Sequence, residues 1–192
     1  MDDARKTALV VGASRTMGSG CAASSSLAGG RSSAPSADRQ LDLVFVNGAI
    51  ANDPDVLDQV TTATFVEVMV TNALSPMRVL EALQSLVPPD GTLGVMSSTQ
   101  GSISRNTNGG HEVYRASKSA LNQLMRSYAA RHADDTRTLL LMDPGWVQTE
   151  LGGEGAPMGV DESVTGVVDT ITAHQHEGGL HYLDYQDRTV PW

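Results

Sequence analysis

Residues 138–142, Thr-Leu-Leu-Leu-Met, form a continuous apolar run that leads directly into the stiff turn Asp143-Pro144-Gly145. An uninterrupted run of this kind is typical of a parallel strand that helices cover on both faces. Four further runs share the character, the last of them more weakly: residues 7–11, 41–46, 92–96 and 180–183. The sequence therefore predicts five strands.

Helical patterns lie between these runs. Residues 61–87 carry a wide apolar face that ends at Pro88-Pro89, residues 112–132 repeat apolar side chains at helical spacing, and a third helix is expected over about 161–174. Strands that alternate with helices of this length predict an α/β fold with a doubly wound, mostly parallel, Rossmann-like sheet. At 192 residues we expect a single domain over 1–192, with a Ser/Ala/Gly-rich loop at about 24–40.

Composition excludes several classes of partner. A formal net charge of −9 disfavours nucleic acid, because phosphate binding needs a basic face. Cys21 is the one cysteine, so no internal disulfide can form and a reducing compartment is expected. The start of the chain lacks a signal-peptide pattern, and no apolar run reaches membrane-spanning length. We therefore expect a cytoplasmic protein with no membrane partner.

A glycine-rich turn follows the first run, over residues 10–20, Val-Val-Gly-Ala-Ser-Arg-Thr-Met-Gly-Ser-Gly. Glycine lets the backbone approach a phosphate closely, and the amides at a helix N-terminus attract the anion. A plain turn is an equally good interpretation of this motif alone. No lysine follows as in a P-loop, which disfavours nucleoside-triphosphate hydrolysis. Arg15 is either a contact for an adenosine 2′-phosphate or a solvated arginine, and Asp38 lacks the preceding strand that would present it to a ribose.

Tyr114 and Lys118 are four residues apart, so they share one face of the predicted helix. A free tyrosine has a pKa of about 10, and a nearby ammonium lowers that pKa because it favours the phenolate. Such a tyrosine can give and take a proton near neutrality. A surface Tyr/Lys pair has the same spacing, so the pair alone does not decide the matter.

Other polar residues are expected at the same edge of the sheet, where open α/β sheets bind ligands. Ser97-Ser98, Asn47-Gly48-Ala49 and residues 143–149 each follow a predicted strand directly. Asn72 lies within an apolar helix, where a polar amide needs a partner. Pro76, four residues later, is expected to kink the helix and free backbone carbonyls.

Together these residues resemble the short-chain dehydrogenase/reductase family, and most closely its C-factor and sniffer-type carbonyl reductase branch. The resemblance covers residues 7–20 and nearly all of 41–192. It is carried by Tyr-Arg-Ala-Ser-Lys-Ser-Ala-Leu-Asn at 114–122, Pro-Gly-Trp-Val-Gln-Thr at 144–149 and Tyr-Gln-Asp-Arg-Thr-Val-Pro-Trp at 185–192.

The resemblance implies hydride transfer between NADP(H), rather than NAD(H), and a small carbonyl or alcohol substrate. It makes Tyr114 the general acid/base and makes Lys118 the residue that lowers the tyrosine pKa and holds the nicotinamide ribose. Ser98, followed by two residues and Gly101, would bind the substrate carbonyl in preference to Ser97, and Asn72 would hold a water in the proton relay. Cofactor-binding positions would be Gly12, Ser14, Arg15, Thr16, Met17, Gly18, Asn47, Gly48, Ala49, Tyr114, Lys118, Pro144, Gly145, Trp146, Val147 and Thr149.

Three departures from the family pattern concern the cofactor. Thr16 replaces the middle glycine, Asn47-Gly48-Ala49 stands where the family has Asn-Ala-Gly, and the family's second and third strands are missing. Only 22 residues separate Gly18 from Leu41, whereas a strand–helix–strand unit needs roughly 30. We expect a sheet shortened by one such unit, with an exposed first strand and weakened NADPH affinity.

The histidines and Trp146 have simpler interpretations, and two other functions are possible for the chain. The five histidines show no metal-ligand spacing supported by cysteine or carboxylate partners, so we expect no metal site; His174 and His176 are interpreted as a solvated loop pair. Trp146 would either line the substrate mouth or cap the core. The rivals are a catalytically impaired family member with a binding or signalling role and a structural subunit; a homodimer or tetramer is expected, with the helices over 61–87 and 112–132 as the contact face.

Overall fold

The computed structural model describes residues 6–12, 41–51 and 56–192. Within them, five strands form one all-parallel sheet in the order β1-β2-β3-β4-β5. The strands are β1 (Ala8–Val11), β2 (Leu43–Val46), β3 (Thr92–Met96), β4 (Thr138–Asp143) and β5 (Gly179–Asp184). The predicted fold class is confirmed, and each strand lies within two residues of its expected bounds.

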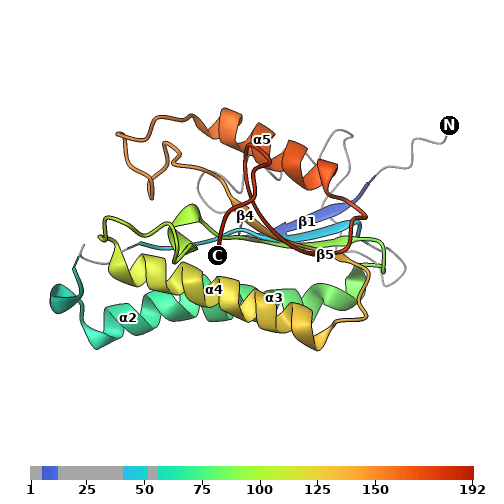
Figure 1. The fold of residues 1–192 in the computed structure, drawn as a ribbon, viewed down its shortest axis with the longest axis horizontal. Coiled ribbons are helices and arrows are strands. Elements are labelled where there is room, and N and C mark those ends of the chain that lie inside the picture. Colours follow the sequence, from blue (N-terminus) through green and yellow to red (C-terminus); the bar gives the residue numbers. More distant parts are fainter. Residues whose placement is uncertain (1–5, 13–40, 52–55) are drawn as a thin grey trace.

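Helices cover both faces of this sheet (Figure 1). One face carries α2 (Thr62–Met69), α3 (Ser75–Leu83) and α4 (Glu112–Arg131), and the other carries α5 (Val160–Ala173). Three short 3₁₀ turns, η1 (Leu57–Gln59), η3 (Gln84–Leu86) and η4 (Thr99–Gly101), join these elements. No helix in the described ranges is both long and apolar enough to cross a bilayer.

Alternate residues of each strand enter two separate cores. Val44 and Val46 of β2 pack with α3 and α4, whereas Phe45 between them packs with α5. This arrangement explains the continuous apolar runs, since every side chain of a doubly covered strand is buried. Gly94 in the middle of β3 makes room for Phe45, because a Cβ there would lie 2.5 Å from the phenylalanine ring.

The two edges of the sheet differ. On one side, β1 is the edge strand of the sheet that the described residues form. Residues 13–40, in which we expect no strand, lie outside the described part of the chain. On the other side, the C-terminal segment turns back along β5, where Leu183 and Thr189 form an antiparallel bridge. The Val190 amide donates to the Tyr182 carbonyl at 2.8 Å.

The predicted helix over 61–87 contains a π-helical turn, η2 (Val70–Leu74), between α2 and α3. The Ser75 amide donates to the Val70 carbonyl, five residues back. Pro76 has no N–H, so the carbonyl of Asn72, four residues earlier, cannot take part in an ordinary α-helical hydrogen bond. The proline therefore changes the helix as predicted, through a widened turn of a kind that occurs frequently at functional sites.

Candidate functional site

Lys118 of α4 lies beside the carboxyl end of β3. Its side chain is fully buried, and Nζ donates to the Met96 carbonyl at 2.9 Å. The same Nζ is 5.8 Å from the centroid of the Tyr114 ring. Burial lowers the pKa of Lys118 to about 8, against a smaller opposing effect of the Asp143 carboxylate. An ammonium has three N–H donors, and only one of them is needed for the bond to the Met96 carbonyl, so the others can donate to further groups.

Tyr114 is half-buried in the first turn of α4, and Asn72 reaches it through Ser117. The Asn72 amide nitrogen donates to Ser117 Oγ at 3.0 Å, and Ser117 Oγ donates to the Tyr114 carbonyl at 2.7 Å. Asn72 is also bonded to Ile50 in both directions, at 2.8 and 2.9 Å. The buried Asn72 amide therefore has the partners that sequence analysis expected. Through them, Asn72 links α4 to the segment after β2.

The two serines after β3 differ in their surroundings. Ser97 is buried, and its Oγ donates to Asn122 Oδ1 at 2.5 Å. Ser98 is half-buried, and its Oγ accepts from the Gln100 amide at 3.2 Å. A hydroxyl that accepts one bond keeps its own hydrogen available to a ligand. Of the pair, Ser98 is therefore the one placed to donate.

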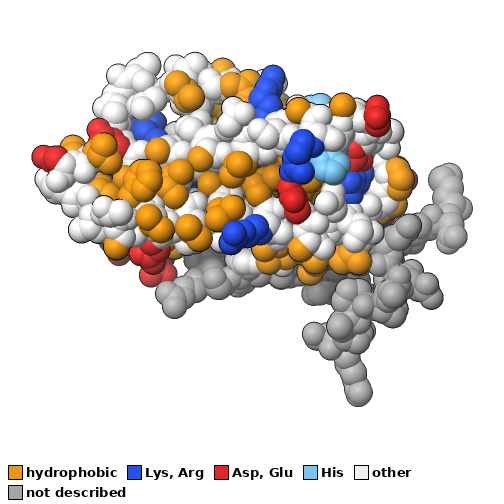
Figure 2. Space-filling view, turned by 90° about the horizontal axis from the view of Figure 1, so that it is seen from below, with side chains coloured by type: hydrophobic (Ala, Val, Ile, Leu, Met, Phe, Trp, Pro, Cys, Tyr) orange, Lys and Arg blue, Asp and Glu red, His pale blue; other side chains and the backbone are white. Residues whose placement is uncertain are grey.

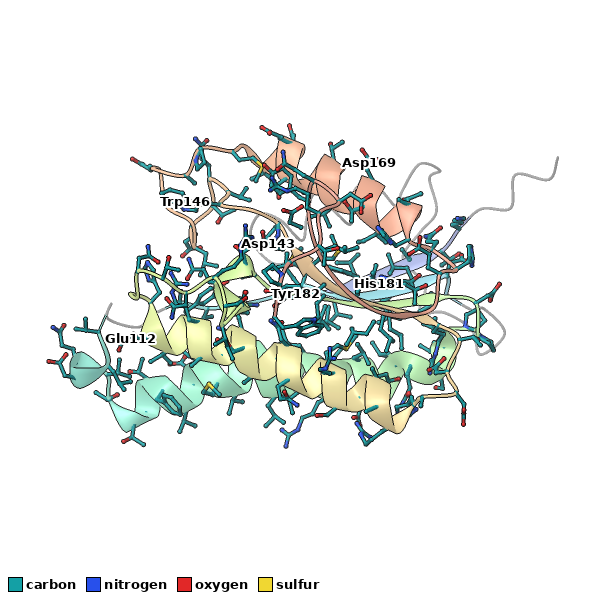
Figure 3. All side chains as sticks on the ribbon, in the orientation of Figure 1. Glu112, Asp143, Trp146, Asp169, His181 and Tyr182 are labelled. Atoms are coloured by element: carbon teal, nitrogen blue, oxygen red, sulfur yellow. The ribbon has the colours of Figure 1, made fainter. Side chains whose placement is uncertain are left out.

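Asp143 joins the ends of β3 and β4. Its carboxylate accepts from the Thr99 amide at 2.7 Å and from the Gly145 amide at 3.3 Å. Burial raises the pKa of Asp143, and the two amide bonds oppose that effect. Figure 3 shows Asp143 and Tyr182 at the same part of the sheet. The Tyr182 hydroxyl donates to the Ser98 carbonyl, which fixes the start of η4 from the side of β5.

Some of the residues predicted to bind the cofactor lie in the described part of the chain, and others lie outside it. Gly12 has φ +86°, and a Cβ there would lie 1.9 Å from the Asn47 carbonyl oxygen, so only glycine allows β1 and β2 to end side by side. A Cβ on Gly48 would meet nothing within 4 Å. Ser14, Arg15, Thr16, Met17 and Gly18 lie outside the described residues.

The turn after β4 is tightly held. Gly145 has φ +78°, and a Cβ there would lie 2.4 Å from Met158 Cε. Val147 is buried, whereas Trp146 is 60% exposed with its indole N–H donating to the Gly152 carbonyl at 2.8 Å. Of the two interpretations of Trp146, capping of the core is therefore excluded.

Comparisons with known proteins identify the family of the chain. A family model described as enoyl-(acyl carrier protein) reductase matches residues 23–172. The C-signal protein of Myxococcus xanthus is 32% identical over 154 residues, which cover 79% of this chain and 93% of that protein. The chain belongs to the short-chain dehydrogenase/reductase family.

Solved structures of other short-chain dehydrogenases/reductases have the same fold. One from Burkholderia multivorans, with bound NADP, is 43% identical with a TM-score of 0.90, and the alignment covers 98% of this chain and 100% of that one. A carbonyl reductase of Pseudomonas aeruginosa in complex with NADP is 27% identical with a TM-score of 0.82, over 97% and 100% of the two chains. The carbonyl reductase Sniffer of D. melanogaster, at 22% identity and a TM-score of 0.83 over 97% and 99%, shares the fold.

Three residues that hold this reductase-family site together had no role in the sequence interpretation. They are Ser117, which links Asn72 to α4, Asn122, which holds Ser97, and Tyr182, which holds Ser98. Asn122 is four residues after Lys118, so the helical period that pairs Tyr114 with Lys118 could have indicated it.

Gly101 lets η4 approach α4, and its substitution is expected to loosen the site. A Cβ at position 101 would lie 2.9 Å from the Lys118 carbonyl carbon, from Lys118 Cβ and from Asn122 Nδ2. Gly101→Ala should therefore lower the free energy of unfolding by about 1–3 kcal/mol, as overpacking does in other cores. Urea unfolding measures the change. Gly155→Ala is the control, because a Cβ there meets nothing within 4 Å; equal midpoints for both variants would contradict the expectation.

Proposed function

We propose that the protein is an NADP(H)-dependent oxidoreductase that transfers a hydride between nicotinamide and a carbonyl or alcohol, with Tyr114 as general acid/base. The observation that carries the proposal is the buried Lys118 ammonium, 5.8 Å from the Tyr114 ring and held by the Met96 carbonyl. A cation in this position stabilises the phenolate, because charges interact strongly where water is excluded.

The residues of the chain divide the work of carbonyl reduction. Tyr114 gives its phenolic proton to the substrate oxygen as charge develops there, and Lys118 stabilises the phenolate that remains. Ser98 donates a hydrogen bond to the same substrate oxygen. Asn72 would hold a water that returns the proton to Tyr114. Because the Asn72 side chain is already bonded to Ile50 and Ser117, its backbone carbonyl, four residues before Pro76, is the group that would bind this water.

The described residues fit a dinucleotide on the nicotinamide side. Lys118 would hold the ribose and the turn from Pro144 to Thr149 the carboxamide, while Gly48, where a Cβ would meet nothing within 4 Å, leaves open space after β2. The cofactor supplies the hydride when bound. NADP(H) is the form proposed, because the similar proteins from Burkholderia multivorans and Pseudomonas aeruginosa have been solved with NADP. Arg15 is the proposed contact of its 2′-phosphate.

A measurement of NADPH affinity tests whether the shortened sheet weakens cofactor binding. With only 22 residues between Gly18 and Leu41, the adenosine half of the cleft has less protein to contact. We expect NADPH to bind in the micromolar range or more weakly, measured by titration of NADPH fluorescence. Submicromolar binding would contradict this expectation without touching the proposed chemistry.

A signalling role is the second candidate function. The similarity to the C-signal protein of Myxococcus xanthus, which covers 79% of this chain, favours it. Carbonyl-dependent oxidation of NADPH across a broad panel of ketones and aldehydes separates the two candidates. Turnover with any of them supports the oxidoreductase, and its absence across the panel supports the signalling role.

Self-association forms part of the proposal. Figure 2 shows a band of hydrophobic side chains on the helical face seen from below. Exposed apolar residues on α2, η2 and α4 contribute to this face: Phe65, Val66, Val70, Leu74 and Leu124. A contiguous apolar surface of this kind is typical of an interface, and a homodimer or tetramer would cover it.

A further inference from the structure

Three side chains at the end of α5 bring metal-ligating atoms together. His174, Glu177 and His181 each offer one nitrogen or oxygen, and these atoms all lie within 4.8 Å of one another. His174 is the C-cap residue that follows α5, Glu177 lies between the turn over 174–176 and β5, and His181 lies in β5. His174 is not the solvated loop residue expected from sequence, because both of its ring nitrogens are bonded to carboxylates.

The distances are close to those of a tetrahedral site. His174 Nδ1 is 2.6 Å from Glu177 Oε2, and His181 Nε2 is 3.8 Å from the same oxygen. Zinc bonds of about 2.1 Å in tetrahedral geometry separate ligand atoms by about 3.4 Å. Small rotations of the three side chains would therefore enclose the ion, which would take the place of the hydrogen between His174 and Glu177. His181 Nε2 would give up its 2.8 Å bond to the Gly178 carbonyl.

A fourth residue supports the same interpretation independently. Asp187, in the turn after β5, lies with Oδ1 2.5 Å from His174 Nε2. Metal-ligating histidines almost always donate their second ring N–H to such a carboxylate, which orients the ring and increases its basicity. His174 therefore has a ligand position on one nitrogen and an orienting carboxylate on the other.

We propose that His174, Glu177 and His181 form a zinc site, with Asp187 orienting His174 and water completing the tetrahedron. Two imidazoles and one carboxylate suit Zn²⁺, and also Ni²⁺ or Cu²⁺, better than Mg²⁺ or Ca²⁺, which take oxygen ligands. Figure 3 shows His181 on the opposite side of the view from Trp146, which belongs to the turn proposed to bind the nicotinamide, so the proposed metal site is separate from that turn. The ion would join the end of α5 to β5 and to the turn that follows β5.

Cobalt spectroscopy on the untagged full chain tests the site, because Co²⁺ in a tetrahedral site absorbs strongly in the visible. We expect one Co²⁺ per chain, displaced by one equivalent of Zn²⁺, and a higher Tm with Zn²⁺ than with EDTA. Glu177→Gln and His181→Gln should each weaken Co²⁺ binding by about 100-fold, and Asp187→Asn by about 10–100-fold.

His176→Asn is the matched control. His176 is adjacent to Glu177, but its ring contacts the Asp90 carbonyl at 2.6 Å, and asparagine tolerates its φ of +69°. This variant should bind Co²⁺ like the wild type. A wild type without tetrahedral absorption, or Glu177→Gln and His181→Gln variants that bind as well as the control, would overturn the proposal. Glu177 is exposed, so its variant tests the site even where His181→Gln fails to fold.

Discussion

Tyr114→Phe should lower kcat for carbonyl-dependent NADPH oxidation by about 1,000-fold, because it removes the proposed proton donor beside the buried Lys118 ammonium. The substitution removes a single oxygen atom and keeps the ring, so the free energy of unfolding should change little. NADPH affinity should fall far less than kcat, since Tyr114 is only one of the many positions predicted to contact the cofactor, whereas the proposed proton transfer depends on its phenol. Steady-state assays with a responsive ketone, together with fluorescence titration of NADPH, measure both effects.

Tyr128→Phe is the control on the same helix. Tyr128 is buried near the other end of α4, and its hydroxyl donates to Gln84 Oε1 at 2.5 Å. Its loss should cost about 1 kcal/mol of stability and leave kcat unchanged. Full activity in Tyr114→Phe would refute the assignment of Tyr114 as the acid/base, and equal losses in both variants would point to a general disturbance of α4.

Lys118→Met should reduce kcat by about 100-fold and change how stability depends on pH. The pKa of Lys118 is lowered to about 8 by burial, from 10.5 in the unfolded chain. Between these values the unfolded state binds more protons than the folded state, so wild-type stability rises with pH relative to a variant without the amine. As the pH rises from about 8 to about 10.5, the wild type should gain about 3 kcal/mol in unfolding free energy relative to Lys118→Met.

Urea unfolding of both proteins at a series of pH values from 7 to 10 follows this shift, because other titrating groups cancel in the difference. Lys6→Met provides the control, since it removes an ammonium from an exposed position. A difference between wild type and Lys118→Met that stays constant with pH would contradict the buried, destabilised ammonium. Met is suitable at position 118 because it fills the apolar length of the lysine side chain without its charge.

The fold was largely predictable from sequence because its signals are local. A strand buried on both faces has to be continuously apolar, and β3 and β4 are buried along their whole length. The π-helical turn could be foreseen only as a disturbance at Pro76. The loop predicted at about 24–40, in place of the family's second and third strands, lies outside the described part of the chain.

For the candidate site, sequence predicted the proximity of residues that one element carries, as with Tyr114 and Lys118 on α4. Tyr182 in β5 and Ser98, two residues after β3, are 84 residues apart, and no sequence spacing predicts a hydrogen bond between them. The cluster around His174 was missed for a different reason, since its residues are close in the sequence. It spans the end of a helix, a turn and a strand, so neither the helical nor the strand period applies to it.

The complete burial of β3 and β4 also bears on motion. Elements with the most buried contacts open only when the whole domain unfolds, whereas exposed loops open locally at low cost in free energy. The Met96 carbonyl that holds Lys118 and the Asp143 carboxylate that holds η4 both belong to these two strands. The ammonium beside Tyr114 is therefore expected to keep its position while the surrounding loops open locally.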